Sequence, residues 1–281
     1  MKLTYRIVNV FARPGERLSG NPLCVFEDGR GLSDADMQAL ALQFNLSETT
    51  FILPSESATA QVRIFTPAME LPFAGHPALG TAHVVRDLLQ AGDQVTLQMQ
   101  AGVIAVSATA DRWTLRANAP VTRGFDPTQT AALATALGLR PNDFAAVPLW
   151  VNAGMEQLLV PLVSPDAVRS AMPGTGLCAF ANHFGKVAVY CFSPLSEAEM
   201  QVRFFFTKHA GSVAEDPATG SACANLGGYA LATGQALPLT RTLSQGELIG
   251  RPSILGLEVD SHAAIHVSGE VIGLGGGAVE L

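Results

Sequence analysis

The sequence predicts an α+β fold made of two similar domains, and three observations support this class. The chain has 281 residues, more than one compact core usually contains and enough for two domains of ordinary size. A segment of the first half recurs in the second half. Short strand-like runs are numerous, whereas each half has one principal helix, which favours α+β over a parallel doubly wound sheet.

The recurring segment covers residues 62–82 and, 140 positions later, residues 202–222. The copies read VRIFTPAMELPFAGHPALGTA and VRFFFTKHAGSVAEDPATGSA, with 8 of 21 positions identical and no gap. Because this period is far too long for a solenoid, we interpret the repeat as two copies of one domain related by a pseudo-twofold axis. We expect domains of residues 1–118 and 119–281, with the last strand, about residues 270–281, able to pair back onto the first domain.

Each copy is expected to form a strand, a loop and then a helix. The strands are residues 60–66 and 201–207, which are rich in apolar, β-branched and aromatic side chains. Proline suits the first helical position, because its missing N–H has no helical partner there, so the helices should begin at Pro77 and Pro217. The capping positions are then His76 and Asp216. The helices should end near Gln90 and Ala232.

Further elements fill the rest of each half. A helix is expected over residues 34–45, with Ser33 as its cap. Another is expected over residues 127–137, with Asp126 as cap and Gly138 as stop. The other strand-like runs are residues 95–99, 104–108, 113–117, 144–151 and 186–191.

Composition excludes several classes of protein. Apolar residues make up 48% of the chain and charged residues 15%, a balance typical of a folded globular protein and not of a disordered one. With 24 acidic and 17 basic residues the formal net charge is −7, and no basic run occurs, so we expect no nucleic-acid partner. No stretch has the pattern of a signal peptide or of an uninterrupted membrane span, so we expect no membrane partner.

Cysteine and histidine usage predicts a reduced, cytoplasmic setting and no metal. The four cysteines are scattered and form no C-x-x-C pair. They are Cys24, Cys178, Cys191 and Cys223. His76 and His83 have no further ligands near them in the sequence, so we expect no metal site. The G-x-G-x-x-A match at residues 273–278 lies too close to the last residue for a βαβ unit, and we expect no cofactor.

Three polar residues are candidates for chemistry: Glu48, between a helix and an apolar run, and His76 and Asp216 at the expected helix starts. Each also has a structural interpretation, with Asp216 and His76 as helix caps and Glu48 as a solvated carboxylate. The repeat favours chemistry, because two equivalent helix N-termini facing one cleft would hold a carboxylate substrate. Glu48 in that cleft would be the proton carrier. Small residues at the helix starts would let the ligand approach the backbone. The expected substrate-binding residues are Gly75, Thr219, Gly220 and Ser221.

A set of motifs follows in order from about residue 5 to the end of the chain. They are GNP at residues 20–22, CVF at 24–26, NLSET at 45–49, RIFTP at 63–67, ELPFAGHP at 70–77, EDPATGSA at 215–222, QG at 245–246 and GRPS at 250–253. Together they resemble the PhzF family of phenazine-biosynthesis isomerases.

The resemblance implies the diaminopimelate epimerase fold, in which each of two domains is a curled, mostly antiparallel sheet around a central helix, with the active site in the cleft between them. It also implies a homodimer and a cofactor-independent isomerase that acts on a small carboxylate such as trans-2,3-dihydro-3-hydroxyanthranilate. Glu48 matches the acid/base that moves a proton between carbons, and His76 and Asp216 match residues that assist it. Gly75, Gly220 and Ser221 match residues that bind substrate.

Two alternatives stay open. One is an epimerase or racemase on the same fold, which would use one cysteine in each half near the helix starts. Those places hold Ala74 and, approximately, Thr219, and Cys223 has no thiol partner in the first half, so a two-thiol reaction is disfavoured. The other is a non-catalytic protein that binds a small acid.

Overall fold

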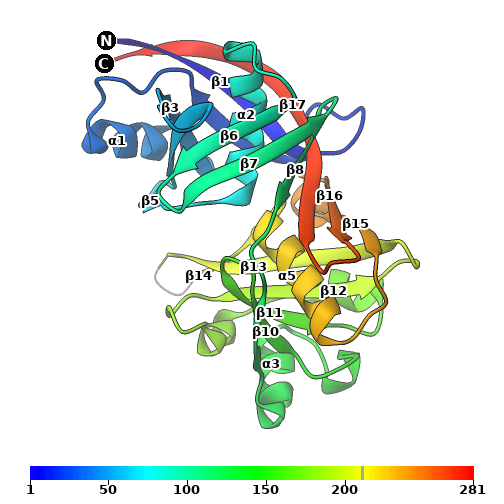
Figure 1. Cartoon of the computed structure of the whole chain (residues 1–281). Coiled ribbons are helices and arrows are strands. Elements are labelled where there is room, and N and C mark those ends of the chain that lie inside the picture. Colours follow the sequence, from blue (N-terminus) through cyan, green and yellow to red (C-terminus); the bar gives the residue numbers. More distant parts are fainter. Residues whose placement is uncertain (210–211) are drawn as a thin grey trace. The chain divides into compact units, whose positions relative to one another are not determined.

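A computed structural model describes residues 1–209 and 212–281, and the chain forms two compact units. Unit 1 consists of Met1–Arg116 and Ser268–Leu281, and unit 2 of Ala117–Val267. The chain therefore leaves unit 1 once and returns to it near its end. Each unit combines a mixed β-sheet with helices, as expected for an α+β protein (Figure 1).

Unit 1 is built on a mixed sheet. Its strands are β1 (Lys2–Ala12), β2 (Asn21–Phe26), β3 (Glu48–Leu53), β4 (Ala60–Phe65), β5 (Glu70–Leu71), β6 (Gln94–Met99), β7 (Gly102–Thr109), β8 (Arg112–Arg116) and most of β17 (Ile265–Glu280). β1 pairs antiparallel with β2, β2 parallel with β3, and β3 antiparallel with β4. β4 pairs antiparallel with β5 and parallel with β6, and the pairs β6–β7 and β7–β8 are antiparallel. The two chain ends meet in this sheet, because β1 runs antiparallel beside β17 (Figure 1).

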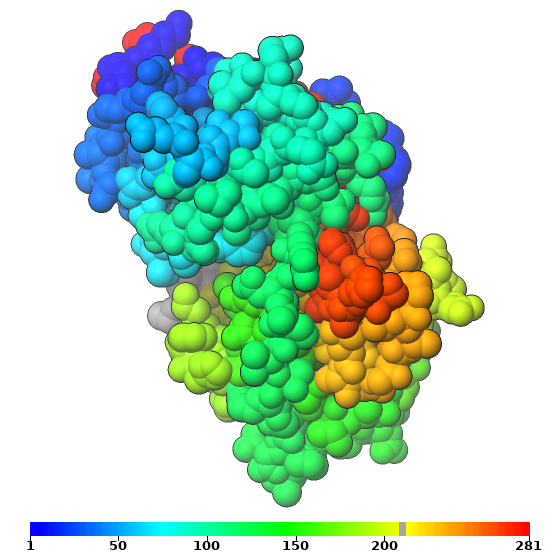
Figure 2. Space-filling view, in the orientation of Figure 1, coloured from blue at the N-terminus to red at the C-terminus, as the bar shows by residue number. Residues whose placement is uncertain are grey.

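The principal helix of unit 1, α2 (Gly75–Leu88), packs against β1, β2, β3, β6 and β8. Small residues allow this close packing: a methyl group on Gly80 would lie 2.6 Å from the Leu23 side chain and 2.8 Å from that of Val10. The buried hydroxyls of Thr50 and Thr81 lie 2.8 Å apart and tie α2 to β3. β6 alternates between buried side chains and exposed or partly exposed ones, because one face of the strand lies towards α2. Residues of β6 and β7 form part of the surface of unit 1 in the space-filling view (Figure 2).

Unit 2 also has strands that pair both parallel and antiparallel. Its strands are β9 (Val121–Gly124), β10 (Leu149–Asn152), β11 (Glu156–Pro161), β12 (Ala188–Pro194), β13 (Glu199–His209), β14 (Ser212–Asp216), β15 (Leu239–Gln245) and β16 (Ser253–Val259). β10–β11 is antiparallel, β11–β12 parallel and β12–β13 antiparallel. β13–β14 is antiparallel, β13–β15 parallel and β15–β16 antiparallel. The succession from β10 to β16 is thus the same as that from β1 to β7 in unit 1.

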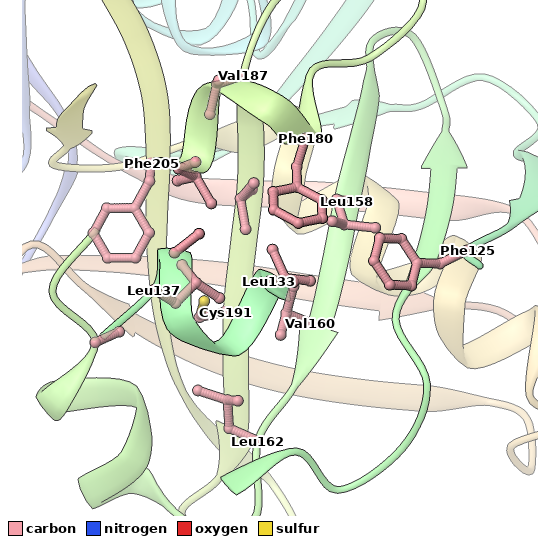
Figure 3. Close-up of a cluster of buried hydrophobic side chains, with 14 of the residues drawn as sticks. Phe125, Leu133, Leu137, Leu158, Val160, Leu162, Phe180, Val187, Cys191 and Phe205 are labelled. Atoms are coloured by element: carbon pink, nitrogen blue, oxygen red, sulfur yellow. The ribbon is translucent and has the colours of Figure 1, made fainter. Parts of the chain in front are cut away.

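The principal helix of unit 2, α5 (Gly220–Ala232), packs against β9, β10, β11 and β16. The shorter helices are α3 (Thr130–Ala136) and α4 (Pro165–Ser170). Apolar side chains from α3 and the residues after it, including Leu133 and Leu137, meet Leu158 and Val160 of β11 in one buried cluster (Figure 3). Phe180 and Phe205 belong to the same cluster, which holds these elements together.

The same set of three side chains occurs in both units. The sets are Arg63, Phe65 and Glu70 in unit 1, and Arg203, Phe205 and Glu215 in unit 2. In each, the arginine forms two hydrogen bonds with the glutamate, of 2.8 and 2.7 Å in unit 1 and of 3.1 and 2.7 Å in unit 2. The guanidinium carbon lies 5.1 Å from the ring centroid of the phenylalanine in unit 1 and 4.7 Å in unit 2. Arg63 and Arg203, like Phe65 and Phe205, are equivalent positions of the sequence repeat, which therefore has a counterpart in side-chain packing, while the two glutamates are not equivalent positions.

Two predicted helix caps are confirmed. α1 (Asp34–Phe44) begins after Ser33, whose hydroxyl accepts from the N–H of Asp36. The helix predicted over residues 127–137 begins as a short 3₁₀ turn capped by Asp126 and continues as α3. Ser and Asp side chains accept from the unpartnered first-turn N–H groups, and this local bond does not depend on the rest of the fold.

The start of α2 differs from the prediction. The helix begins at Gly75, with Ala74 as N-cap, so His76 lies in the first turn and not at the capping position. Pro77 is the third helical residue. Proline fits there as well as at the first position, because none of the first-turn N–H groups has a helical partner.

The start of α5 also differs. The helix begins at Gly220, with Thr219 as N-cap, and the predicted cap Asp216 is the last residue of β14. Asp216 pairs with Phe204 of β13. This sheet pairing overrides the local preference of an Asp-Pro sequence for a helix start.

The strand predicted over residues 144–151 is wrong in its first half. Only β10 forms, and Phe144 contributes an isolated bridge to Leu162. Pro148 lacks an N–H and cannot donate to a ladder, so regular pairing begins only after it. Within residues 1–209 and 212–281, none of the helices combines the length and the apolar character needed to cross a membrane.

Candidate active site

The first group of candidate residues lies in unit 1, where Glu48 and His76 are hydrogen-bonded. Glu48 is the first residue of β3 and His76 the second residue of α2. Glu48 Oε2 and His76 Nδ1 lie 2.9 Å apart. The Thr50–Thr81 bond ties the same two elements together further along, so the packing of α2 on β3 holds the pair in place.

Both side chains of the pair are largely buried, His76 with 6% and Glu48 with 18% of its surface exposed. His76 Nε2 is buried and makes no hydrogen bond to any residue that the structure describes, and the same is true of Thr49 Oγ1. A buried polar atom without a partner costs about 1–3 kcal/mol, so such atoms point to sites where a ligand completes the bonding. The arrangement offers a carboxylate and an imidazole that can exchange a proton, and the buried Nε2 of the imidazole is an atom that a ligand could satisfy. Thr49, next to Glu48 on β3, points to the other face of the strand.

Both principal helices begin without a side-chain cap. The N-caps Ala74 and Thr219 make no side-chain hydrogen bond to the first turn of α2 or α5. Among the residues that the structure describes, no capping side chain therefore satisfies the N–H groups at Gly75 in unit 1, or at Gly220 and Ser221 in unit 2. Helix N-termini of this kind bind anions, because their N–H groups and the helix dipole favour negative charge.

The second group lies in unit 2, in the turn between β14 and α5. Thr219 Oγ1 donates to Asp216 Oδ2 at 2.5 Å. Gln245 Nε2 donates to the Asp216 carbonyl oxygen at 2.8 Å and to Thr219 Oγ1 at 3.0 Å. Gln245 Oε1 accepts from the Thr219 N–H at 3.4 Å. Because the Thr219 hydroxyl accepts from Gln245, its proton is directed to Asp216, whose carboxyl group is held in one orientation as an acceptor.

Gly246 lets the segment after Gln245 approach this turn. Its φ of +81° is in the left-handed region, and a methyl group on it would lie 2.2 Å from the Arg251 carbonyl oxygen and 2.6 Å from that of Pro217. No side chain fits in that space. This close approach brings the Gln245 side chain within hydrogen-bond distance of Asp216 and Thr219.

Ser221, in the first turn of α5, has a buried partner that no motif marks. Its Oγ accepts from Gln157 Nε2 at 2.8 Å, and Gln157 Oε1 accepts from Asn225 Nδ2 at 2.8 Å. Gln157 lies 64 positions before Ser221 and 68 before Asn225. Local sequence patterns carry no information about contacts at such distances, so no sequence signal identifies these two amides.

The cysteines are largely buried. Burial raises the pKa of the Cys24 and Cys191 thiols to about 12. Cys223 is fully buried in α5, where its Sγ lies 3.7 Å from the carbonyl oxygen of Gly256. The residues that the structure describes contain no group of three or more His, Cys, Asp or Glu side chains placed to hold a metal ion.

Comparisons with known proteins agree with this fold. Residues 8–279 match the model of a family described as phenazine biosynthesis-like protein, PhzC-PhzF. The chain is 39% identical over 275 residues to an uncharacterized isomerase of Pasteurella multocida, covering 97% of this chain and 92% of that protein. It is 34% identical over 288 residues to the trans-2,3-dihydro-3-hydroxyanthranilate isomerase of Pseudomonas fluorescens, covering 99% of each.

A solved structure shows the same fold. The Bacillus anthracis phenazine biosynthesis protein of the PhzF family superposes with a TM-score of 0.86 at 22% identity, covering 100% of both chains. The relatives found by sequence are named isomerases, and by this kinship the chain is an isomerase. With a family model matched over nearly its whole length, the chain belongs to the phenazine biosynthesis-like protein family, PhzC-PhzF.

Proposed function

We propose that the chain is a cofactor-independent isomerase that moves a proton, and with it a double bond, on a small carboxylate-bearing substrate such as a dihydrohydroxyanthranilate-like compound. The observation that carries the proposal is the buried hydrogen bond between Glu48 and His76. The name of the Pseudomonas fluorescens relative supports the substrate class, since that protein covers the chain almost entirely.

In the proposed reaction Glu48 is the general acid/base. Its carboxylate takes a proton from a ring carbon, and the electron pair left on that carbon delocalises into the double bonds conjugated with the substrate carboxylate. The protonated Glu48 then returns a proton to a different carbon of the same system, so substrate and product are isomers. His76 keeps the Glu48 carboxyl oriented through Nδ1, and its Nε2 is available to the substrate.

The residues at the starts of the two principal helices are proposed to bind the substrate. N–H groups at Gly75, Gly220 and Ser221 would face its carboxylate, and Asp216, held by Thr219, would accept a hydrogen bond from a substituent such as an amine or hydroxyl. The proposal requires the two groups to meet around one substrate in a cleft between two copies of one domain. The common order of strand pairs, the repeated Arg–Phe–Glu set and the two uncapped helices support the interpretation of the units as two copies of one domain. A homodimer is proposed from the family resemblance.

Turnover of trans-2,3-dihydro-3-hydroxyanthranilate in D₂O, followed by proton NMR, tests the proposal, and related small unsaturated acids serve as further substrates. We expect an isomer to form in which a different carbon carries the transferred hydrogen. Deuterium should enter at that carbon to the extent that Glu48 exchanges with solvent before it returns the proton. A protein that binds these acids without forming an isomer or exchanging a C–H would contradict the proposal.

A further inference from the structure

Two buried amide side chains of unit 2 form a chain of hydrogen bonds that ends at Ser221. Gln157, on β11, and Asn225, on α5, both have 0% of their surface exposed. Asn225 Oδ1 accepts from the backbone N–H of Ala153 at 2.7 Å, and Asn225 Nδ2 donates to the carbonyl oxygen of Met155 at 2.8 Å. Asn225 Nδ2 also donates to Gln157 Oε1, and Gln157 Nε2 donates to Ser221 Oγ, both at 2.8 Å.

The two backbone groups fix the direction of this chain. An N–H can only donate and a carbonyl oxygen can only accept, so Ala153 and Met155 together allow one orientation of the Asn225 amide. Asn225 then donates an N–H to Gln157, and Gln157 must accept it with its side-chain oxygen. A flipped Gln157 would place two donors against each other in a buried site, at the cost of unsatisfied polar groups. The nitrogen of Gln157 is therefore the atom that faces Ser221.

The consequence for Ser221 is a hydroxyl of defined polarity. Its oxygen already accepts a hydrogen bond from Gln157, so its own proton is directed to another acceptor. The Ser221 side chain is partly exposed, and it lies beside Gly220 at the uncapped start of α5. An acceptor-only group, such as a carboxylate, matches a hydroxyl proton presented next to free helix N–H groups.

We propose that Gln157 and Asn225 are positioning residues that make Ser221 a hydrogen-bond donor to the substrate carboxylate. The inference rests on the proposed function, which places Ser221 in the substrate site. It also gives this subsite a preference for acceptors, because Gln157 occupies one of the two lone pairs of the Ser221 oxygen and the hydroxyl proton is left to be donated. Neither amide touches the substrate, and both act through the serine.

The test measures binding of 3-hydroxyanthranilate, an aromatic carboxylate of the same ring class without a proton to shift. The variants are Gln157→Leu, which removes the donor, and Gln157→Glu, whose ionised carboxylate would accept the Ser221 proton. Each substitution should raise the dissociation constant of the probe about tenfold or more, as expected for one lost hydrogen bond to a charged group. Gln235→Glu, an exposed site on the same unit, should bind as the wild type does. Thermal unfolding of each variant reports whether it is folded.

A pH series separates polarity from packing. Burial raises the pKa of an introduced carboxyl group, and its protonated form can again donate to Ser221 Oγ. For each variant, the dissociation constant of the probe is divided by that of the wild type. This ratio should fall towards 1 for Gln157→Glu as the pH drops from 8 to 5.5. For Gln157→Leu it should stay constant. Equal behaviour of the two ratios would overturn the proposal.

A double-mutant cycle with Ser221→Ala shows whether Gln157 acts through the serine. The Gln157→Leu change should have little further effect in the Ser221→Ala background. If the losses of binding free energy in the two single variants add up fully in the double variant, Gln157 does not act through Ser221, and this proposal is overturned. The proposed isomerase activity would not be affected by that result. If the Ser221→Ala variant binds the probe like the wild type, Ser221 does not bind the carboxylate, and the proposed role of Gln157 and Asn225 is overturned as well. Turnover in D₂O tests the isomerase independently of these binding data.

Discussion

Glu48 Oε2 and His76 Nδ1 lie 2.9 Å apart, while the second nitrogen of the same imidazole is buried without a partner among the described residues. The carboxyl group thus has a fixed neighbour, and the histidine has a free polar atom. A structural histidine is normally satisfied at both nitrogens, because an unpartnered buried nitrogen lowers stability. The pair is therefore better explained by chemistry than by folding.

The first prediction concerns His76. His76→Leu should lower kcat on the proposed substrate about 100-fold or more, because Glu48 loses its orienting partner and the substrate loses Nε2. The melting temperature should change little, because removing one buried unsatisfied nitrogen offsets the loss of the Glu48 partner. His76→Asn, whose amide N–H can reach towards Glu48, should recover part of the activity. Wild-type activity of His76→Leu would contradict this role.

The second prediction concerns the loop behind Asp216. Gly246→Ala should lower the free energy of unfolding by about 2–4 kcal/mol, because the new methyl group collides with two carbonyl oxygens as well as straining a positive φ. Gly234→Ala is the matched control, since Gly234 has a φ of +69° and open space around it. It should cost only about 1–2 kcal/mol. Urea unfolding measures both, and equal losses would show that the contact with Pro217 and Arg251 is unimportant.

The third prediction concerns pH and His83. Burial lowers the pKa of His83, against an opposing effect of Asp111, and Trp113 Nε1 donates to its Nδ1 at 3.3 Å. The unfolded chain then binds a proton at a higher pH than the folded one, so stability falls as the pH drops below about 6.5 towards the folded pKa. His83→Gln should flatten this part of the curve. His262→Gln, at an exposed site, should keep the wild-type slope, and a wild-type slope in His83→Gln would refute the assignment.

The fourth prediction concerns thiols. The thiolate is the reactive form, and burial keeps Cys24 and Cys191 protonated at neutral pH. Iodoacetamide should therefore modify the native protein mainly at the half-buried Cys178 and leave isomerase activity intact. Peptide mass spectrometry locates the label. Activity lost in step with labelling of Cys223 would favour the thiol-based epimerase alternative.

The parts of the fold that sequence predicts well are those decided locally. Ser33 and Asp126 cap helices through bonds to their own neighbours, and both starts are confirmed. Asp216 shows the limit: its Asp-Pro context predicts a cap, but pairing with Phe204 makes it the end of a strand. That pairing is set by the sheet and not by the adjacent residues.

The residues of the candidate site likewise divide into those that the sequence identifies and those that only the structure shows. Glu48, His76 and Ser221 lie in recognisable motifs, so sequence identifies them without showing what holds them. Gln157, which bonds Ser221, and Asn225, which bonds Gln157, lie in no motif, because the groups that the fold places around a buried amide determine its role. Gln245 belongs partly to each group. The QG motif marks it in the sequence, but only the structure shows its hydrogen bonds to Asp216 and Thr219.

The central claim is that Glu48 carries the proton, and Glu48→Gln tests it most directly. Glutamine keeps the size of the side chain and a hydrogen bond to His76 but cannot accept and return a proton. Wild type, Glu48→Gln and the exposed control Glu56→Gln are compared with the proposed substrate in D₂O. We predict that Glu48→Gln loses isomerisation and deuterium incorporation together, by about 100-fold to 10,000-fold, while it still binds 3-hydroxyanthranilate and Glu56→Gln behaves as wild type. A Glu48→Gln variant that isomerises the substrate at the wild-type rate would contradict the account.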